Sequence, residues 1–226
     1  MLGAAVVAAG ATACTHAGIG HNSSAPAQPA TATALAPLLE QVRIVERIRP
    51  VAGYDRGCGK SQSCVYGPAW NDPDNHSGCD TRSRLLASSL RNVEFKPGTH
   101  NCKPIAGTLD PDPYTGQTVD LRHVEADHVY PLRRSWDAGA WQWNPKQRQT
   151  FANDLTELIA VSEQANRAKS DAGLNEWLPS YRPCDYIQRY LTVAIKYQLP
   201  ITTAERSTAV NTCRSTTGPA NVPAKA

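Results

Sequence analysis

The first segment of the chain contains no charged side chain. No lysine, arginine, aspartate or glutamate occurs in the first 39 residues, so every charge lies between Glu40 and Lys225. The whole sequence has a formal net charge of only +3, and 19% of its residues are charged, which excludes a histone-like basic protein and a strongly acidic disordered chain. The charged part, roughly 180 residues long, has the size of one domain.

C-x-x-C pairs are also absent, although the chain has seven cysteines. The absence of this spacing argues against a zinc ribbon and against a thioredoxin-type redox pair. Seven cysteines in so short a chain favour an oxidising compartment. We therefore expect an exported protein that is stapled by disulfides.

The N-terminal segment lacks a basic beginning. Residues 1–13 are small and apolar, as in the hydrophobic part of a signal peptide, and they are too few to span a bilayer as a helix. Because a signal peptide starts with basic residues, we expect a Lys/Arg-rich beginning to precede this sequence. The Ala-Thr-Ala-Cys of residues 11–14 resembles a bacterial lipobox. Two outcomes stay open, which are lipidation of Cys14 and ordinary cleavage after Ala13.

Composition then divides the chain. Residues 15–37 are uncharged and rich in Ala, Ser, Thr, Pro and Gly, which predicts a flexible tether. The expected parts are a signal-peptide or lipobox-like segment (1–14), a tether (15–37), a folded domain (38–213) and a disordered tail (214–226). The domain is expected to be secreted, or held at the outer face of a bacterial membrane by a lipid on Cys14, and to be a monomer.

The folded part shows a mixture of helical and strand patterns. Helices are expected over 35–48, 81–90 and 163–171. Strands are expected over 117–121 and 123–129, as the two arms of a hairpin, and a short apolar segment follows at 156–161. Three tryptophans are expected in the core, namely Trp136, Trp141 and Trp143. These patterns predict an α+β domain.

Six cysteines remain when Cys14 is set aside, and six permit fifteen pairings. One pair follows from geometry. Residues 183–199 have helical spacing, and the capping box at 202–205 opens a second helix that runs to about Cys213. Two such helices form an antiparallel hairpin, which brings Cys184 close to Cys213. By chain order, the other pairs are Cys58 with Cys64 and Cys79 with Cys102.

The residues that carry chemistry lie at the end of a strand and on a later helix. Asp127 and His128 precede Pro131, which stops the strand, and both can serve one site only where the strand bends. Asn166 and Lys169 share one helical face. A carboxylate and an amide oxygen are ligands that Mg²⁺ accepts while keeping most of its waters. A neutral imidazole beside them can take a proton from water, so the sequence predicts a site that cuts phosphodiester bonds.

With these residues in this order, the sequence resembles the HNH, or ββα-metal, endonucleases. It is most similar to the secreted actinobacterial-type branch that resembles the C-terminal nuclease domain of GmrSD restriction systems. The resemblance covers roughly residues 51–205 and rests on the order of several short motifs. These motifs are Gly78-Cys79-Asp80-Thr81-Arg82, Asp112-Pro113-Tyr114-Thr115-Gly116, Asp127-His128-Val129-Tyr130-Pro131-Leu132, Trp136-Asp137-Ala138-Gly139-Ala140, Phe151-Ala152-Asn153-Asp154, Leu158-Ile159-Ala160-Val161, Asn166-Arg167-Ala168-Lys169-Ser170-Asp171 and Trp177-Leu178-Pro179.

The resemblance implies a fold and a role for several residues. The fold is a ββα-metal (HNH) core with additional helices. His128 matches the general base, and Asp127 and Asn166 match the ligands of Mg²⁺ or of another divalent ion such as Mn²⁺. Lys169 matches a catalytic basic residue near the phosphate. The implied function is an endonuclease that hydrolyses DNA with little sequence specificity outside the cytoplasm, and RNA stays open as a second substrate.

The middle position of the motif departs from the family pattern. It falls on Glu157, where the family more often has an asparagine that braces the loop and orients the base. Either the Glu157 carboxylate hydrogen-bonds His128, which raises its basicity, or Asn153 substitutes from the same loop. We count Glu157 among the expected catalytic residues.

Arginines near the motif are candidates for binding nucleic-acid phosphates. The expected contacts are Arg122, Arg133, Arg134 and Arg148. Carboxylates interleave with these arginines, so we expect weak, salt-sensitive and largely sequence-independent binding.

Two other functions stay open at this stage. A metal-independent hydrolase, such as a glycosidase, is possible with a carboxylate pair drawn from Asp110, Asp112, Glu125 and Asp127. A non-catalytic surface lipoprotein derived from a nuclease is the other possibility, and the departure at Glu157 favours it. Cleavage of plasmid with and without EDTA distinguishes all three.

Overall fold

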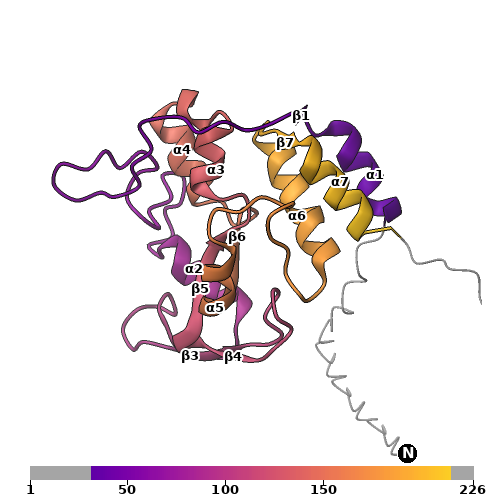
Figure 1. The fold of residues 1–226 in the computed structure, drawn as a ribbon. Helices are drawn as coiled ribbons and strands as arrows, with labels where there is room; N and C mark the ends of the chain where they lie inside the picture. Colours follow the sequence, from indigo (N-terminus) through magenta and orange to yellow (C-terminus); the bar gives the residue numbers. More distant parts are fainter. Residues whose placement is uncertain (1–31, 215–226) are drawn as a thin grey trace, which may run out of the picture.

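The computed structural model describes residues 32–214. The expected signal segment with Cys14, most of the expected tether and nearly all of the expected tail lie outside the described residues. Within them, short helices and small sheets alternate along the chain, which confirms the α+β class (Figure 1). In this range no helix is both long and apolar enough to cross a bilayer.

A strand pair and the helix after it form the part that carries the motif. Strand β5 (Val124–His128) runs antiparallel to β6 (Leu158–Ser162), with Val124 opposite Ser162 and His128 opposite Leu158. Helix α5 (Glu163–Lys169) follows β6 at once, and its cap Ser162 accepts a hydrogen bond from the Ala165 amide. The three elements lie close together in Figure 1, and α5 packs against both strands.

The expected hairpin of residues 117–121 and 123–129 is wrong. Strand β4 (Val119–Asp120) pairs with β3 (Pro104–Leu109), which also pairs with β2 (Arg91–Phe95). A short 3-10 helix, η1 (Leu121–His123), separates β4 from β5, and the Asp120 side chain caps it by accepting from the Arg122 amide. The chain therefore leaves one sheet before it enters the next.

Helix α2 (Thr81–Ser89) packs on the β5–β6 pair. Asp80 caps its first turn by accepting from the Ser83 amide. Leu85 and Leu86 then join a cluster with Leu158 and with residues of β3 and β5. This helix supports the strands from the side of the smaller core.

The larger core lies under the C-terminal helices. Helices α6 (Pro183–Lys196) and α7 (Thr203–Thr212) flank β7 (Ile201–Thr202), which pairs in parallel with β1 (Ile44–Val45). Thr202 and Glu205 form the predicted capping box. Helix α1 (Ala32–Gln41) packs on α6, and Leu35 is only 1% exposed. The folded part therefore begins inside the expected tether, and the helix expected over 35–48 ends at Gln41 because β1 follows.

A third group of helices packs on the larger core. It consists of α3 (Leu132–Asp137), η2 (Ala140–Gln142) and α4 (Pro145–Ala152). Trp136 is buried there and Trp143 packs partly buried against Phe151, as expected. Trp141 is 45% exposed, so its placement in the core is wrong.

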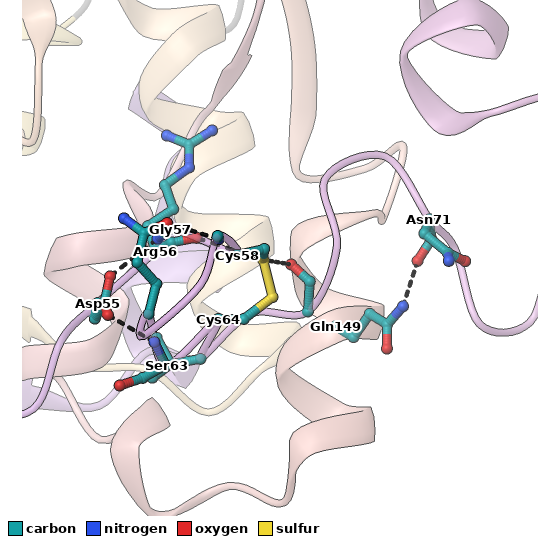
Figure 2. Close-up of a disulfide and its surroundings, with 12 residues drawn as sticks. Asp55, Arg56, Gly57, Cys58, Ser63, Cys64, Asn71 and Gln149 are labelled. Carbon is teal, nitrogen blue, oxygen red and sulfur yellow. Dashed lines mark hydrogen bonds between the residues drawn. A yellow bond between two sulfur atoms is a disulfide. The ribbon is translucent and has the colours of Figure 1, made fainter.

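Three disulfides join the cysteines in the predicted pairs: Cys58–Cys64, Cys79–Cys102 and Cys184–Cys213. The last pair joins the start of α6 to the end of α7, as the helical-hairpin argument requires. The first pair closes a small loop, in which Asp55 accepts from the amides of Gly57 and Ser63 (Figure 2).

Candidate active site

Asp127 and His128 end β5 at the floor of an open cleft of about 800 Å³. Glu125 and Ala126 from the same strand, and Asn166 from α5, line the same cleft. The sequence therefore brings the expected base and both expected metal ligands to one place, although neighbouring residues of a strand point to opposite faces.

The His128 ring is held by the backbone of α4. Its Nε2 lies 3.1 Å from the carbonyl oxygen of Ala152. Because a carbonyl only accepts, Nε2 carries the proton of the neutral ring and Nδ1 keeps the basic lone pair. Burial, together with the positive charges of Arg56 and Lys169, lowers the pKa of His128 to about 3, although the hydrogen bond to the Ala152 carbonyl opposes this shift. The imidazole is therefore neutral at physiological pH.

Glu157 does not hydrogen-bond this ring, which corrects the preferred expectation. It is fully buried, and its carboxylate oxygens accept from the Tyr130 amide at 3.2 and 3.1 Å. Burial raises the pKa of the Glu157 carboxyl well above its usual value. Glu157 thus braces the chain just after β5 and does not orient the imidazole.

Asn153 holds the loop that presents the Ala152 carbonyl. Its Nδ2 donates to the carbonyls of Gln149 (2.9 Å) and Asn71 (3.2 Å). Its Oδ1 accepts from the Thr81 hydroxyl at 2.8 Å. Asn153 therefore makes the bracing contacts that the family pattern assigns to the middle position of the motif. These contacts act on His128 through the neighbouring carbonyl of Ala152.

Lys169 lies behind the pair and does not face the cleft, so its expected place beside the phosphate is wrong. Its side chain is 1% exposed, and its Nζ donates to Asp127 Oδ1 at 3.0 Å and to the His128 carbonyl at 2.8 Å. Lys169 ends α5, one turn after Asn166. The Lys169 side chain points into the protein, and its ammonium group is the counterion that the buried Asp127 carboxylate needs.

Asp127 has a second buried partner. The Tyr114 hydroxyl donates to its Oδ2 at 2.6 Å. Burial raises the pKa of Asp127, and the Lys169 ammonium and the Tyr114 hydroxyl oppose that shift. These partners occupy most of the acceptor positions of the carboxylate and leave room for one further contact.

The oxygen atoms around the cleft fit a hard divalent cation. Asn166 donates through Nδ2 to Glu125 Oε2 at 2.8 Å, so its amide lies between the helix and the strand. Asp127, Asn166 and Glu125 together offer carboxylate and amide oxygens, the ligands that Mg²⁺ prefers when it keeps several waters. Over residues 32–214, no group of three or more His, Cys, Asp or Glu is arranged so that it could hold a metal ion, so the fit depends on the amide oxygen of Asn166 as well as on the carboxylates.

The walls of the cleft carry arginines and aromatic rings. The arginines are Arg56, Arg82, Arg133 and Arg167, and the rings are Tyr54 and Trp70. Arg133 is thus the one expected phosphate contact that lines the cleft. Sequence reasoning missed Arg56 and Trp70 because the loop that carries them has no periodic pattern.

The other three expected phosphate contacts lie elsewhere. Arg134 is largely buried and pairs with Glu205 at 2.9 Å. Arg148 donates through Nε to the Val65 carbonyl at 2.6 Å. Arg122 is 78% exposed, pairs with Asp120 and does not line the cleft. Internal pairing therefore removes Arg134 and Arg148 from the surface that a ligand can reach.

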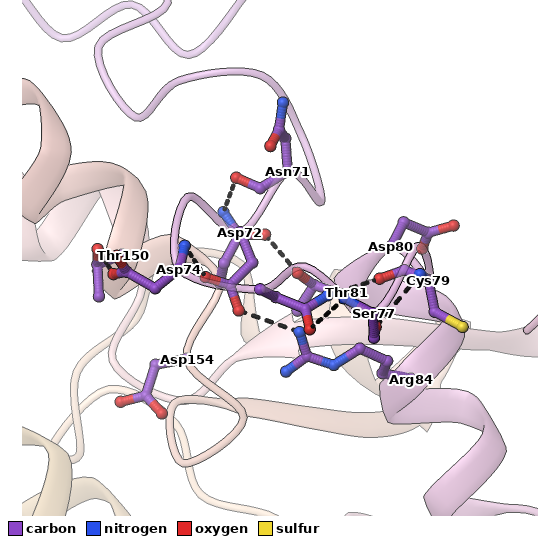
Figure 3. Close-up of polar contacts among 12 residues, drawn as sticks. Asn71, Asp72, Asp74, Ser77, Cys79, Asp80, Thr81, Arg84, Thr150 and Asp154 are labelled. Carbon is purple, nitrogen blue, oxygen red and sulfur yellow. Dashed lines mark hydrogen bonds and ion pairs between the residues drawn. The ribbon is translucent and has the colours of Figure 1, made fainter.

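The segment after Trp70 is fixed by polar contacts to two helices (Figure 3). The Thr81 amide donates to the Trp70 carbonyl at 3.0 Å, and Arg84 pairs with Asp72 at 3.0 Å. From α4, the Thr150 hydroxyl donates to Asp74 at 3.1 Å. The backbone of this segment has no helix or strand, but these hydrogen bonds and the ion pair hold it in place.

Comparisons with known proteins agree with this arrangement. A match to the family described as GmrSD restriction endonucleases, C-terminal domain, spans residues 80–208. The chain is also 37% identical over 143 residues to a protein of Arthroderma benhamiae described as an uncharacterized secreted protein, and this alignment covers 60% of the chain and 68% of the relative. No solved structure matches the chain. The family match includes the whole of β5, β6 and α5, and on this evidence the chain belongs to the family of GmrSD restriction endonuclease C-terminal domains, an HNH-type nuclease family.

Proposed function

We propose that the protein is a metal-dependent endonuclease that hydrolyses phosphodiester bonds of DNA with little sequence specificity. The observation that carries this proposal is the His128 imidazole, whose Nε2 is engaged by the Ala152 carbonyl on the floor of an arginine-lined cleft. Family membership supports nuclease activity in general.

His128 acts as the general base through Nδ1, which accepts a proton from the attacking water. The Nε2–H bond to Ala152 keeps the ring in the required tautomer and orientation. A pKa near 3 makes the ring a weak base in the free protein. A phosphate in the cleft raises that pKa, because a nearby negative charge favours the imidazolium.

Asp127 and Asn166 hold the divalent ion, Mg²⁺ or Mn²⁺, and Glu125 is a third oxygen ligand within the same cleft. When bound, the ion neutralises charge on the scissile phosphate and on the leaving oxygen. Arg56, Arg82 and Arg133 bind the flanking phosphates. These contacts are not to base edges, so the binding is independent of sequence.

The site of action is outside the cytoplasm. Three disulfides persist in an oxidising compartment, and the relative from Arthroderma benhamiae is described as secreted. The protein works as a monomer, and a lipid on Cys14 would hold it at a membrane.

A carboxylate-pair hydrolase has less support. Asp112 is fully buried and accepts from the Tyr114 amide and from the Thr115 hydroxyl. Asp127 is committed to Lys169 and Tyr114. Of this set only Glu125 and Asp127 line the cleft, and each already accepts a hydrogen bond from a neighbouring side chain.

The test is cleavage of supercoiled plasmid, and of a labelled RNA, with Mg²⁺, Mn²⁺ or EDTA. We expect nicked and linear DNA with either ion and intact DNA in EDTA. Asn166→Ala should raise the Mg²⁺ concentration for half-maximal rate, and Asn175→Ala, at an exposed asparagine outside the cleft, should not. Activity that persists in EDTA indicates a metal-independent hydrolase, and DNA binding without cleavage indicates a non-catalytic protein.

A further inference from the structure

Trp70 is a large aromatic side chain that the protein does not bury. It is partly exposed and lines the catalytic cleft next to His128. Its indole is nearly parallel to the imidazole, with an interplanar angle of 11° and ring centroids 6.2 Å apart. Trp70 also lines a second cavity of about 140 Å³, together with Tyr66, Leu132 and Ala152. A ring that borders two cavities is not packed on every side.

The backbone at Trp70 is held in an unusual conformation. Its φ is +61°, in the left-handed region that bulky residues rarely adopt. The Thr81 amide fixes its carbonyl at 3.0 Å, and the next carbonyl, of Asn71, accepts from Gln149 at 2.7 Å and from Asn153 at 3.2 Å. Such strain persists only where the surroundings impose it, and it clusters at ligand sites. The strain here directs a partly exposed ring toward the cleft.

Fixed positive charge lies in the same cleft. The Arg133 guanidinium is 5.2 Å from the centre of the Tyr54 ring, and its Nε donates to Asp137 at 2.9 Å. Arg133 is thereby held in one orientation, and its cation covers the Tyr54 ring. Trp70 is then the cleft aromatic that remains available for stacking.

An aromatic ring beside arginines is the arrangement that binds single strands, because bases stack on the ring while the arginines follow the phosphates. In a duplex both faces of a base are already stacked, and an aromatic ring at the side of the helix gains little. Building on the proposed function, we propose that Trp70 stacks on an unpaired nucleobase beside the scissile phosphate. The preferred substrate is then a single strand or a locally unpaired region. The family match begins at Asp80, so this subsite lies outside it.

The experiment measures binding without cleavage. Fluorescence anisotropy in EDTA compares the full chain with a labelled single-stranded oligonucleotide, its blunt duplex, and an abasic strand of the same length. The variants are Trp70→Leu, which removes the ring, and Trp70→Phe, which keeps an aromatic face. Trp141→Leu is the matched control at an exposed tryptophan outside the cleft. Thermal unfolding shows whether each variant is folded.

We expect the wild type to bind the single strand more tightly than the duplex. Trp70→Leu should weaken single-strand binding by roughly 5- to 150-fold, and Trp70→Phe should recover part of that loss. The Leu variant and the wild type should bind the abasic strand equally, because the phosphates are retained and the bases are gone. Trp141→Leu should change nothing.

Four results overturn the inference. Equal losses on the normal and abasic strands mean that Trp70 only supports the loop. Preference for the duplex, or no loss in folded Trp70→Leu, excludes the base-stacking role while leaving the nuclease proposal intact. Failure of the wild type to bind the single strand also overturns the stacking role, and plasmid cleavage with Mg²⁺ then decides the nuclease proposal separately.

Discussion

The two walls of the catalytic cleft are built in different ways. The wall formed by β5, β6 and α5 is regular, and its charges are paired inside the protein, as Lys169 with Asp127 shows. The opposite wall, from residue 53 to residue 80, has no helix or strand and is held by the Cys58–Cys64 disulfide and by contacts to backbone carbonyls. The first wall fixes the reacting groups through burial. The second presents Arg56 and the rings of Tyr54 and Trp70 to a ligand, so changes in the two walls should affect different measurements.

Breaking the buried pair should have the largest effect on stability. Lys169→Met leaves the Asp127 carboxylate buried without its counterion, which should lower the free energy of unfolding by about 3–5 kcal/mol. Urea denaturation measures the loss. Arg167→Met, on the exposed side of the same helix, should cost about 0.5 kcal/mol or less. A Lys169→Met protein as stable as the wild type would show that the pair does not hold this wall.

Removing one disulfide at a time should separate effects on the free energy of unfolding from effects on substrate binding. The chain-entropy account gives a loss of roughly 3.5 kcal/mol for the pair Cys184→Ala/Cys213→Ala and roughly 2 kcal/mol for Cys58→Ala/Cys64→Ala. Of these two pairs, only Cys58–Cys64 lies in the loop that carries Arg56 and Trp70, and Cys58 lines the small cavity beside Trp70, so its removal alone should raise KM for DNA cleavage. Denaturant melts and steady-state kinetics on both variants test this. An unchanged KM in the folded Cys58/Cys64 variant contradicts a substrate-binding role for that wall.

Glu157→Gln should have the smallest effect at low pH. The amide oxygen of Gln can still accept from Tyr130, so the hydrogen bond is kept. Because the folded pKa of Glu157 lies well above 4.5, its contribution to stability is full below that pH and is lost as pH rises toward the folded pKa. The variant should therefore become more stable than the wild type as pH increases above about 4.5. Unfolding measured from pH 4 to pH 8 checks this, and a constant difference would mean that Glu157 stays ionised.

The sequence predicted local features better than distant partners. The pairing of Cys184 with Cys213 followed from two helices of similar length and a capping box, which are local signals. The partner of β5 was missed, because β6 comes thirty residues later and nothing near β5 specifies it. Lys169 was expected beside the phosphate, and its burial was missed because a lysine on a polar helix has no sequence signal for burial.

Asn153, Ala152 and Trp70 show where sequence reasoning stops in the site. The group that holds the His128 ring is the backbone carbonyl of Ala152, and no side-chain motif identifies such a group. Asn153 was weighed only as an alternative to Glu157, and its contacts to Asn71 and Thr81 bring together segments far apart in the chain. Trp70 lies in a segment rich in turn residues, so only its place in the folded cleft reveals a role.

The most direct test of the account is the cleavage rate of His128→Ala at saturating Mg²⁺. Loss of a positioned general base should lower kcat by roughly 10²- to 10⁴-fold while the protein stays folded. His123→Ala is the matched control, because His123 is exposed on η1 and pairs only loosely with Glu163, at 3.7 Å. Its rate should match that of the wild type. A folded His128→Ala protein that cleaves DNA at nearly the wild-type rate would contradict the proposal that His128 is the base.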